Sequence, residues 1–305
     1  MGEKWLVTGA NGNLGRRLVT LCCEQGDEVV AVVRSERAAQ TLRGLELGNA
    51  ASRLSIETLE YGDVDRLRAA AAGCSAAVHL VGILKEGGGA TYEQAHERSC
   101  EALARALEGG DVQQLVYLSI VGSKPDAGNA CLASKGRAED ILLNGEIPTS
   151  VLRVPMVLGE GDYASFALKS RASKRLSFTF RAGSLEQPIY AGDVAAAVTA
   201  AGRGRVGNLA LDLGGPEVLS RRALSERAAA RMGRSPGVLC SLPLPLGLIM
   251  AGLLERVLAN PPVTRAMLEV LDHDDHVDAE AALDRLGTSL TPLDETLDAV
   301  LAPKA

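Results

Sequence analysis

The stretch that decides the fold is Val7-Thr8-Gly9-Ala10-Asn11-Gly12-Asn13-Leu14-Gly15-Arg16, in which glycine recurs at every third position. An apolar run precedes it at residues 4–8, and helically spaced leucines and valine follow it at residues 13–25. Spaced glycines alone are weak evidence. A glycine turn that leaves a strand and opens a helix is the phosphate-binding turn of a βαβ unit. The sequence therefore predicts that the phosphates of a nucleotide are bound here.

Each glycine of this turn has its own predicted role. Gly9 permits the tight turn, Gly12 lets the backbone approach a pyrophosphate, and Gly15 lets the helix pack close to the sheet. The unpaired N–H groups at the helix N-terminus favour the anion. A purely structural glycine turn is the competing interpretation. We predict a Rossmann-type site for a nicotinamide dinucleotide, with cofactor contacts from Gly9, Asn11, Gly12, Asn13, Leu14, Gly15 and Arg16.

The residue after the second predicted strand, residues 28–33, indicates which dinucleotide is bound. NAD-binding domains of this type carry an acid there, which hydrogen-bonds the ribose 2′-hydroxyl. This chain carries Arg34, a cation suited to a 2′-phosphate, which Arg16 and Arg37 could assist. We therefore predict NADP as the cofactor, with NAD as the alternative. The simpler interpretation of Arg34 is a solvated charge.

Strands and helices alternate along the first half of the chain. Apolar and β-branched runs predict strands at residues 4–8, 28–33, 52–58, 76–81, 114–120 and 150–154, and helical spacing predicts helices at residues 13–25, 64–72, 92–107 and 133–143. This alternation predicts an α/β fold, a Rossmann-type doubly wound parallel sheet with helices on both faces and right-handed crossovers.

After Pro155 the pattern changes, and this change sets the predicted domain division. The next residues are loop-rich and basic. We expect residues 1–158, with residues 188–213 returning to the core, to form an NAD(P)-binding Rossmann domain. Residues 159–187 and 214–305 are expected to form a smaller C-terminal lobe for a substrate or a partner.

One segment of this lobe, residues 242–258, is strongly apolar. Pro243 and Pro245 interrupt its start and Glu255 and Arg256 its end, so its uninterrupted part is shorter than the ~20 residues that span a bilayer. We therefore predict no transmembrane segment and a helix buried in the lobe. Docking of this helix on a membrane surface or a hydrophobic protein is the alternative.

Composition argues against several classes of function. The 305 residues carry a formal net charge of −6 with both signs interspersed, and without a basic stripe we expect no nucleic-acid partner. Hydrophobic residues make up 47% and aromatic residues 3%, which predicts an aliphatic core. The first residues show no secretory signal and the six cysteines contain no CxxC pair, which predicts reduced, mostly buried thiols and a cytoplasmic protein.

Beyond the turn, the chain carries Tyr61-Gly62-Asp63-Val64, His79-Leu80-Val81-Gly82 and a stretch at residues 154–162 that begins Val154-Pro155. With the glycine turn, these segments resemble the extended or atypical branch of the short-chain dehydrogenase/reductase superfamily. In that family they contact the adenine, line the cofactor and lie beside the nicotinamide. The resemblance implies cofactor contacts from Asp63, Val64, Val81, Gly82, Lys135 and Pro155.

Three stretches carry a narrower resemblance: His79-Leu80-Val81-Gly82-Ile83, Tyr92-Glu93-Gln94-Ala95-His96 and Pro261-Pro262. They are similar to the group that includes the nicotinamide-binding accessory subunit of respiratory complex I and its bacterial relatives.

The superfamily's catalytic pattern is only partly present. It consists of a Tyr-x-x-x-Lys pair on the helix after the fifth strand and a serine or threonine at the end of that strand. Ser119 matches the polarising position and Lys135 the lysine that holds the ribose hydroxyls, but Cys131 stands where the tyrosine belongs. Cys131 is either a working acid or nucleophile or, more simply, a small residue that fills the tyrosine's place. Tyr163 is an alternative proton donor.

The histidines offer little further chemistry. His79 is expected near the cofactor cleft and His96 on a helix surface. His273 and His276 have the spacing of metal ligands, but no other ligand cluster supports them, so we predict no metal site.

Two functions remain open from the sequence. One is an NADPH-dependent reductase or epimerase-like enzyme with altered acid–base groups and an unidentified small-molecule substrate. The other is a non-catalytic, nucleotide-bound structural, assembly or redox-sensing protein. Both require the dinucleotide, and they differ in what Cys131 can do.

Overall fold

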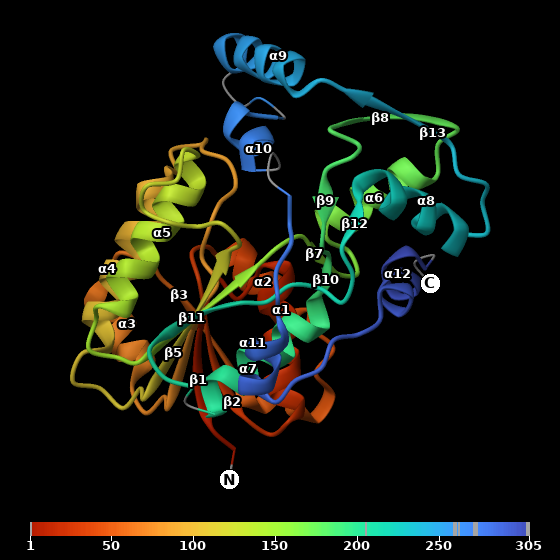
Figure 1. The fold of residues 1–305 in the computed structure, drawn as a ribbon. Helices are drawn as coiled ribbons and strands as arrows, with labels where there is room; N and C mark the ends of the chain where they lie inside the picture. Colours follow the sequence, from red (N-terminus) through yellow and green to blue (C-terminus); the bar gives the residue numbers. More distant parts are fainter. Residues whose placement is uncertain (1, 205, 259–260, 262, 271–273, 303–305) are drawn as a thin grey trace.

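The computed structural model describes residues 2–204, 206–258, 261, 263–270 and 274–302. At its centre lies a parallel sheet of seven strands in the order β11-β6-β5-β4-β1-β2-β3 (Figure 1). The strands are β1 (Lys4–Thr8), β2 (Glu28–Val33), β3 (Leu54–Thr58), β4 (Ala76–His79), β5 (Gln114–Ile120), β6 (Thr149–Val154) and β11 (Leu209–Asp212). The strand order reverses between β1 and β4, and open α/β sheets bind their ligands at such a switch point.

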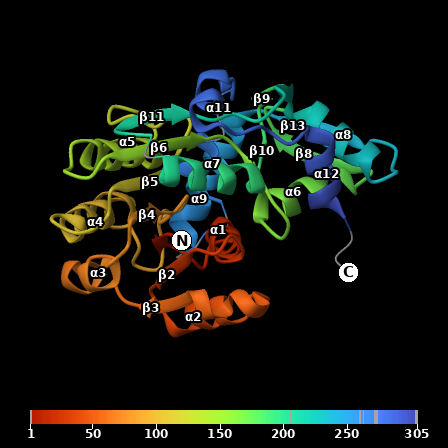
Figure 2. The ribbon, with the colours of Figure 1, turned by 90° about the horizontal axis from the view of Figure 1, so that it is seen from below.

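Helices cover both faces of the sheet, as Figure 2 shows from below. One face packs α1 (Asn13–Glu24), α2 (Glu36–Arg43), η1 (Gly48–Arg53), α7 (Ala191–Gly204) and α11 (Glu280–Leu286), and the other packs α3 (Val64–Ala71), α4 (Ser99–Leu107) and α5 (Ala130–Leu143). A cluster of buried, mainly aliphatic side chains fills each interface. All six cysteines are free thiols and all but Cys240 are buried, as the sequence predicted.

The predicted fold class, a doubly wound parallel α/β sheet, is confirmed, and each predicted strand of the first half is present. The bounds differ in places: β4 ends at His79, and α5 begins at Ala130 rather than at residue 133. The helix predicted at residues 92–107 is divided. Its first part, η2 (Glu93–Arg98), is a π-helical turn that α4 continues.

The remaining elements form a smaller region above and to the right of the sheet in Figure 1. They are β7 (Val157–Leu158), α6 (Tyr163–Ala172), β8 (Leu176–Phe180), β9 (Leu185–Glu186), β10 (Ile189–Tyr190), β12 (Leu219–Ser220), α8 (Arg221–Arg231), β13 (Val238–Leu242), α9 (Leu244–Val257), α10 (Arg265–Val270) and α12 (Leu293–Leu301). A third cluster, which includes Leu158, Leu168, Leu224 and Leu297, packs α6, α8 and α12 together.

The expectation that residues 159–186 are mostly loop is wrong, because α6 and β8 lie within them. The Asp162 carboxylate accepts the Ser165 N–H at 2.7 Å and caps the start of α6. This bond satisfies one of the N–H groups that a helix N-terminus leaves unpaired.

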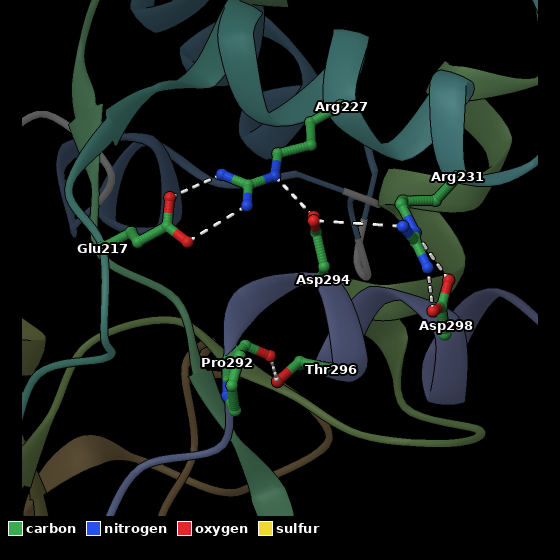
Figure 3. A network of polar contacts seen from close by, with 7 residues as sticks. All are labelled: Glu217, Arg227, Arg231, Pro292, Asp294, Thr296 and Asp298. Atoms are coloured by element: carbon green, nitrogen blue, oxygen red, sulfur yellow. Dashed lines mark hydrogen bonds and ion pairs between the residues drawn. The ribbon is translucent and has the colours of Figure 1, made fainter.

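Ion pairs fasten α12 to α8, as Figure 3 shows. Arg227 on α8 contacts Glu217 at 2.5 Å and Asp294 of α12 at 2.6 Å. Arg231, one helical turn further along α8, pairs with Asp298 and approaches Asp294 at 3.9 Å. The C-terminal helix is therefore held to the lobe by charges as well as by its buried leucines.

Residues 242–258 are largely helical, but the prediction that this helix is buried is wrong. On α9 only Gly247 and Ala251 are buried, whereas Ile249, Leu253 and Val257 are 63%, 55% and 80% exposed. The hydropathy of a segment gives its apolar character, but it does not determine which other elements of the fold pack against it. Here α9 packs mainly against α10 at the upper edge of the molecule (Figure 1).

Among the described residues, no helix is both long and apolar enough to pass through a lipid bilayer.

Candidate functional site

The glycine turn connects β1 to α1 at the carboxyl edge of the sheet. Gly9 has a φ of +73°, which glycine adopts without strain, and the Gly12 N–H donates to the Gly9 carbonyl oxygen at 3.1 Å. Gly12 is the N-cap of α1, so no capping side chain bonds the first turn, which also holds no acidic residue. The helix N-terminus is therefore open to an anion such as a pyrophosphate.

Close packing requires glycine at two positions of the turn. A Cβ on Gly9 would lie 3.0 Å from the Leu80 carbonyl carbon, and a Cβ on Gly15 would lie 2.6 Å from the carbonyl oxygens of both Gly9 and Ala10. A Cβ on Gly12 would meet only the Gly9 carbonyl oxygen, at 3.4 Å, which is ordinary contact. The fold itself therefore does not demand glycine at Gly12, whereas a ligand that approaches the backbone would.

Arg34 follows β2 and lies over the ring of Tyr61, with its guanidinium carbon 5.6 Å from the ring centroid. The Tyr61 hydroxyl accepts the Gly9 N–H at 3.1 Å and donates to the Val32 carbonyl oxygen at 3.4 Å. Tyr61 thus links the arginine to the glycine turn. Tyr61 opens the segment that is expected to contact the adenine, but the sequence predicted no role for its ring or hydroxyl.

Asp63 and Val64 lie at the start of α3. Asp63 is the N-cap, and its Oδ1 accepts the Arg66 N–H at 3.1 Å. Val64 is half-buried and packs against the core cluster on that face. The segment predicted to contact the adenine is therefore fixed by a helix cap beside the sheet edge.

Two side chains of α1 hold the loop after β7 against the glycine turn. Asn13 and Arg17 donate to the Glu160 carbonyl oxygen at 3.2 and 2.8 Å. The Glu160 carboxylate pairs with Arg17 at 2.5 Å and accepts the Tyr190 hydroxyl at 2.8 Å. The Arg16 Nε is buried without a hydrogen-bond partner among the described residues. The Asn13 side chain therefore positions the loop.

Lys135 of α5 lies beside Gly82, just beyond the end of β4. Its Nζ donates to the Leu118 carbonyl oxygen at 2.9 Å and to the Tyr117 hydroxyl at 3.0 Å. A Cβ on Gly82 would lie 3.1 Å from this Nζ, so the absence of a side chain at Gly82 lets the lysine approach the backbone there. Burial lowers the pKa of Lys135 to about 8.

Three side chains hold the backbone of Ile83 and Leu84, and we call His96, Cys131 and Tyr92 the loop clamp. The His96 Nε2 accepts the Ile83 N–H at 3.1 Å. The Cys131 thiol donates to the Ile83 carbonyl oxygen at 3.5 Å, and the Tyr92 hydroxyl donates to the Leu84 carbonyl oxygen at 3.0 Å. Each member of the clamp bonds one backbone group, while the His96 Nδ1 is buried without a hydrogen-bond partner among the described residues.

The prediction that His96 lies on a helix surface is wrong, because His96 is fully buried. The π-helical turn η2 is wider than an α-helical turn, which shifts the residues that face the sheet. His79 is also buried, with Thr8 Oγ1 at 2.6 Å and Ser99 Oγ at 3.1 Å from its ring nitrogens. Burial lowers the pKa of each imidazole to about 3, so both are neutral at pH 7.

Cys131 stands in the tyrosine's place and exposes no surface. Burial raises the pKa of its thiol to about 11, so the thiol is protonated at neutral pH. The thiolate is the reactive form of cysteine. Asn129 caps α5 by accepting the N–H groups of Cys131 and Leu132 at 2.9 and 3.1 Å. The geometry gives Cys131 a structural contact with the Ile83 carbonyl oxygen and no exposed surface.

Ser119 is part of a buried network on the same side of the sheet. Its hydroxyl donates to the Glu139 carboxylate, which also accepts hydrogen bonds from Arg153 at 2.9 and 2.5 Å. Ser119 and Glu139 are each 1% exposed. The structure therefore brings Gly9, Gly82 and Lys135 to one edge, while the Ser119 hydroxyl is engaged with α5.

Other predicted residues lie apart from this arrangement. Tyr163, the first residue of α6, is 79% exposed, and Pro155 is half-buried directly after β6. His273 lies outside the described residues. Within the described part of the chain, no group of three or more histidine, cysteine or acidic side chains could hold a metal ion.

The match to a protein family covers most of the site. Residues 9–201 match the family model described as NAD(P)H-binding, from the glycine turn to α7. The chain belongs to this NAD(P)H-binding family. The prediction that the chain is an NAD(P)-binding protein of Rossmann type is therefore confirmed at the level of the family.

Two curated proteins are similar in sequence. Subunit 9 of the NADH dehydrogenase [ubiquinone] 1 alpha subcomplex of Arabidopsis thaliana mitochondria is 27% identical over 250 residues, 80% of this chain and 61% of that protein. The ceramide reductase of Caulobacter vibrioides is 26% identical over 168 residues, 55% of this chain and 50% of that protein. The predicted resemblance to the complex I accessory group is confirmed. The chain spans less than two thirds of the length of either relative.

Solved structures share the fold. Bordetella bronchiseptica WbmH, determined in complex with NAD+, superposes with a TM-score of 0.71 at 17% identity over 99% of this chain and 97% of its own. The UDP-N-acetylglucosamine 4-epimerase of Bacillus cereus gives a TM-score of 0.71 at 16% identity, with 97% of each chain covered. At these identities the likeness establishes the architecture alone.

Proposed function

We propose that this protein binds NADP(H) along the carboxyl edge of the sheet and holds it as a ligand, without acting as a carbonyl reductase of the tyrosine-dependent type. The observation that carries this proposal is the state of Cys131. Its thiol is buried, protonated and bonded to the Ile83 carbonyl oxygen. The chain then serves as a nucleotide-bound structural, assembly or redox-sensing protein.

The residues along the edge suit a dinucleotide from one end to the other. The open N-terminus of α1 and the bare Gly12 suit the pyrophosphate, and Lys135 at Gly82 suits the ribose hydroxyls on the nicotinamide side. Asp63 and Val64 would contact the adenine. Leu14, Val81 and Pro155 would line the cofactor, with Asn11 and Arg16 beside the phosphates.

Arg34 is the feature that favours NADP over NAD. Its guanidinium is exposed, held over Tyr61, and tied through that hydroxyl to Gly9. Glu36, the first acid after β2, is paired with Arg43. A fixed cation beside the ribose binds a 2′-phosphate strongly, because guanidinium–phosphate contacts are charge-assisted hydrogen bonds.

The chemistry available at the nicotinamide end is limited by the missing phenol. When bound, NADPH supplies a hydride, and a carbonyl acceptor then needs a proton. General acid catalysis of that step is worth ~10²–10⁴-fold and requires hydrogen-bond reach to the substrate. Cys131 lacks that reach because its thiol is sealed in the loop clamp, and Tyr92 in the same clamp donates to Leu84.

A reductase is the second candidate, and Lys135 is the observation that favours it. Two of its three ammonium protons are donated, to Tyr117 and Leu118, and its Nζ lies beside Gly82. With a pKa lowered to about 8, the ammonium is a usable acid near neutral pH. One of the similar proteins is named a reductase, which supports this second candidate.

Turnover of NADPH separates the two candidates. Purified protein is mixed with NADPH and a panel of ketones, aldehydes and quinones, and NADPH absorbance is followed. We expect no turnover above the protein-free rate for the wild type or for Cys131→Ala. We expect Cys131→Tyr, which supplies the phenol, to raise the rate with at least one substrate by roughly 10²-fold.

Two results would assign the reductase instead. One is wild-type turnover that Lys135→Met abolishes while NADPH binding is retained. The other is wild-type turnover that Cys131→Ala abolishes, which would make Cys131 the working acid.

A further inference from the structure

Exposed apolar side chains gather on α9 in a pattern that a helix covering a core would not leave open. The exposed residues are spaced by three and four positions: Leu246, Ile249, Met250, Leu253 and Val257. Residues at that spacing share one side of a helix. Their exposed fractions run from 47% to 80%, while Gly247 and Ala251 are buried.

The two-stranded sheet of β8 and β13 also exposes apolar side chains, and on β8 the polar side chains between them are buried. On β8, Leu176 and Phe178 are 53% and 57% exposed, whereas the intervening Ser177 and Thr179 are buried. Val238 of β13, which pairs with Leu176 in the parallel register, is 64% exposed. A strand that covers a core turns its apolar side chains inward, so Leu176, Phe178 and Val238 are directed away from the protein, whereas Leu239 of β13 is buried.

The sheet and the helix form one surface. A Cβ on Gly247 of α9 would lie 2.6 Å from the Phe180 ring, so the end of β8 packs directly against α9. On the other strand, β13 continues through Pro243 into α9. We call the combined surface the apolar face, and it consists of Leu176, Phe178, Val238, Leu246, Ile249, Met250, Leu253 and Val257.

Three cations border the apolar face at Val238. Lys174, Arg175 and Arg234 line a hollow of about 380 Å³ together with Val238. All three are exposed, and in the part of the chain that the structure describes none of them forms an ion pair with a carboxylate. The chain as a whole has a net charge of −6, so this cluster is a local reversal of sign.

We infer that the apolar face and the basic hollow bind the surface of an anionic lipid bilayer. The apolar face would enter the boundary between headgroups and acyl chains, and the three cations would contact headgroup phosphates. Apolar area sets the strength of such binding, and attraction to anionic lipid adds about a fivefold gain per cation near the surface. A peripheral contact of this kind requires no helix that crosses the membrane.

Vesicle cosedimentation of the full chain tests this inference. The probes are vesicles of phosphatidylcholine mixed with phosphatidylglycerol and vesicles of phosphatidylcholine alone. We expect at least ~10-fold tighter binding to the anionic vesicles, with the difference shrinking in high salt. Ile249→Asp with Leu253→Asp should abolish sedimentation. Lys174→Glu, Arg175→Glu and Arg234→Glu together should remove the preference for anionic lipid.

Matched variants separate a specific surface from a general charge or folding effect. Ile249→Leu with Leu253→Met keeps the surface apolar and should bind as the wild type does. Arg53→Glu, Arg66→Glu and Arg105→Glu together change the net charge equally on exposed positions outside the apolar face and should retain the preference. Circular dichroism confirms that each variant is folded.

Three outcomes overturn the inference. They are the absence of binding to either vesicle, equal loss in the Arg53, Arg66 and Arg105 control, and a dimer in solution that Ile249→Asp with Leu253→Asp dissociates. The last result would make a second copy of the chain the occupant of the apolar face.

Discussion

His96, Cys131 and Tyr92 hold three consecutive peptide groups, from Gly82–Ile83 to Leu84–Lys85, and all three do so in their neutral forms. Burial lowers the pKa of His96 to about 3, raises that of Cys131 to about 11, and raises that of Tyr92 well above its ordinary value. A neutral imidazole accepts the Ile83 N–H, whereas an imidazolium would have no lone pair for it. The His96 contact of the loop clamp therefore exists only while His96 stays unprotonated.

Acid should unfold the protein through its buried histidines. In the folded state His79 and His96 have pKa values of about 3, below the ordinary 6.5, so the unfolded state binds more protons between these values. Their stabilising contribution is complete above pH 6.5 and is lost as the pH falls towards 3. We expect the free energy of unfolding to fall by about 1.4 kcal/mol per pH unit for each histidine. Urea denaturation at pH 6.5, 5.5 and 4.5 measures this slope.

His96→Gln supplies the comparison, because it removes one of the two titrating groups. The free energy of unfolding of this variant should fall less steeply with decreasing pH, by about 1.4 kcal/mol per pH unit. An NMR titration of the wild type in which His96 protonates near pH 6.5 would contradict the buried neutral clamp.

Lys135 should lower the stability of the ligand-free protein. Burial lowers its pKa from 10.5 to about 8, so the charged form is penalised below pH 8 and the penalty is relieved as the pH rises from 8 to 10.5. We expect Lys135→Met to raise the free energy of unfolding of the ligand-free protein at pH 7 by roughly 1–3 kcal/mol. The gain should shrink towards pH 10, and NADPH affinity should fall. A loss of stability at pH 7 would show that the lysine is a net structural contact.

At the scale of elements, glycine is needed in the turn for two different reasons that the sequence pattern does not distinguish. Gly15 is needed for packing of the protein, and Gly12 for the approach of a ligand. Gly15→Ala places a Cβ against two carbonyl oxygens, so we expect a loss of about 1–3 kcal/mol in stability. Gly12→Ala adds a Cβ that meets only the Gly9 carbonyl oxygen, at 3.4 Å, so we expect a smaller stability loss of no more than about 1 kcal/mol, as for an N-cap substitution, and a large loss of NADPH affinity. Thermal denaturation and titration calorimetry on both variants measure the two effects. Equal stability losses would contradict this division.

The central sheet could be predicted from the sequence because its strands are buried on both faces. Such strands are continuous apolar runs, and β1, β2, β5 and β6 all fall where those runs lie. The glycine turn was predictable because its spacing and its flanking elements agree. These signals are local, so they can be interpreted without knowledge of the tertiary structure.

The features that could not be predicted from the sequence depend on tertiary packing, that is, on which elements cover a given side chain. His96 is buried in the π-helical turn η2, and the spacing of apolar residues at positions 92–107 predicts an ordinary α-helix there. The apolar residues of α9 predicted a buried helix, but the number of elements covering it is a property of the whole fold. The start of α6 did carry a signal, Asp162 three residues before Ser165, which is the spacing of a helix cap.

At the scale of the whole molecule, Arg227 is one of two arginines of α8 that pair with acidic residues of α12, and it also pairs with Glu217. Its guanidinium contacts Glu217 and Asp294 and is one-third exposed, so solvent screens part of each pair. We expect Arg227→Met to lower the free energy of unfolding by about 1 kcal/mol, and the loss to shrink in high salt. Arg98→Met, which removes a more exposed pair on η2, is the control and should change stability less. A loss that does not depend on salt would assign Arg227 a packing role.

The measurement that tests the central claim most directly is a calorimetric titration of the ligand-free protein with NADPH and with NADH. We expect one site per chain and an affinity for NADPH at least ~10-fold higher than for NADH, because each charge-assisted contact to the 2′-phosphate adds about 1.5–3 kcal/mol. Arg34→Ala should bring the two affinities together without a change in stability. Binding of neither dinucleotide would contradict the site itself, and equal binding of both by the wild type would contradict the role of Arg34.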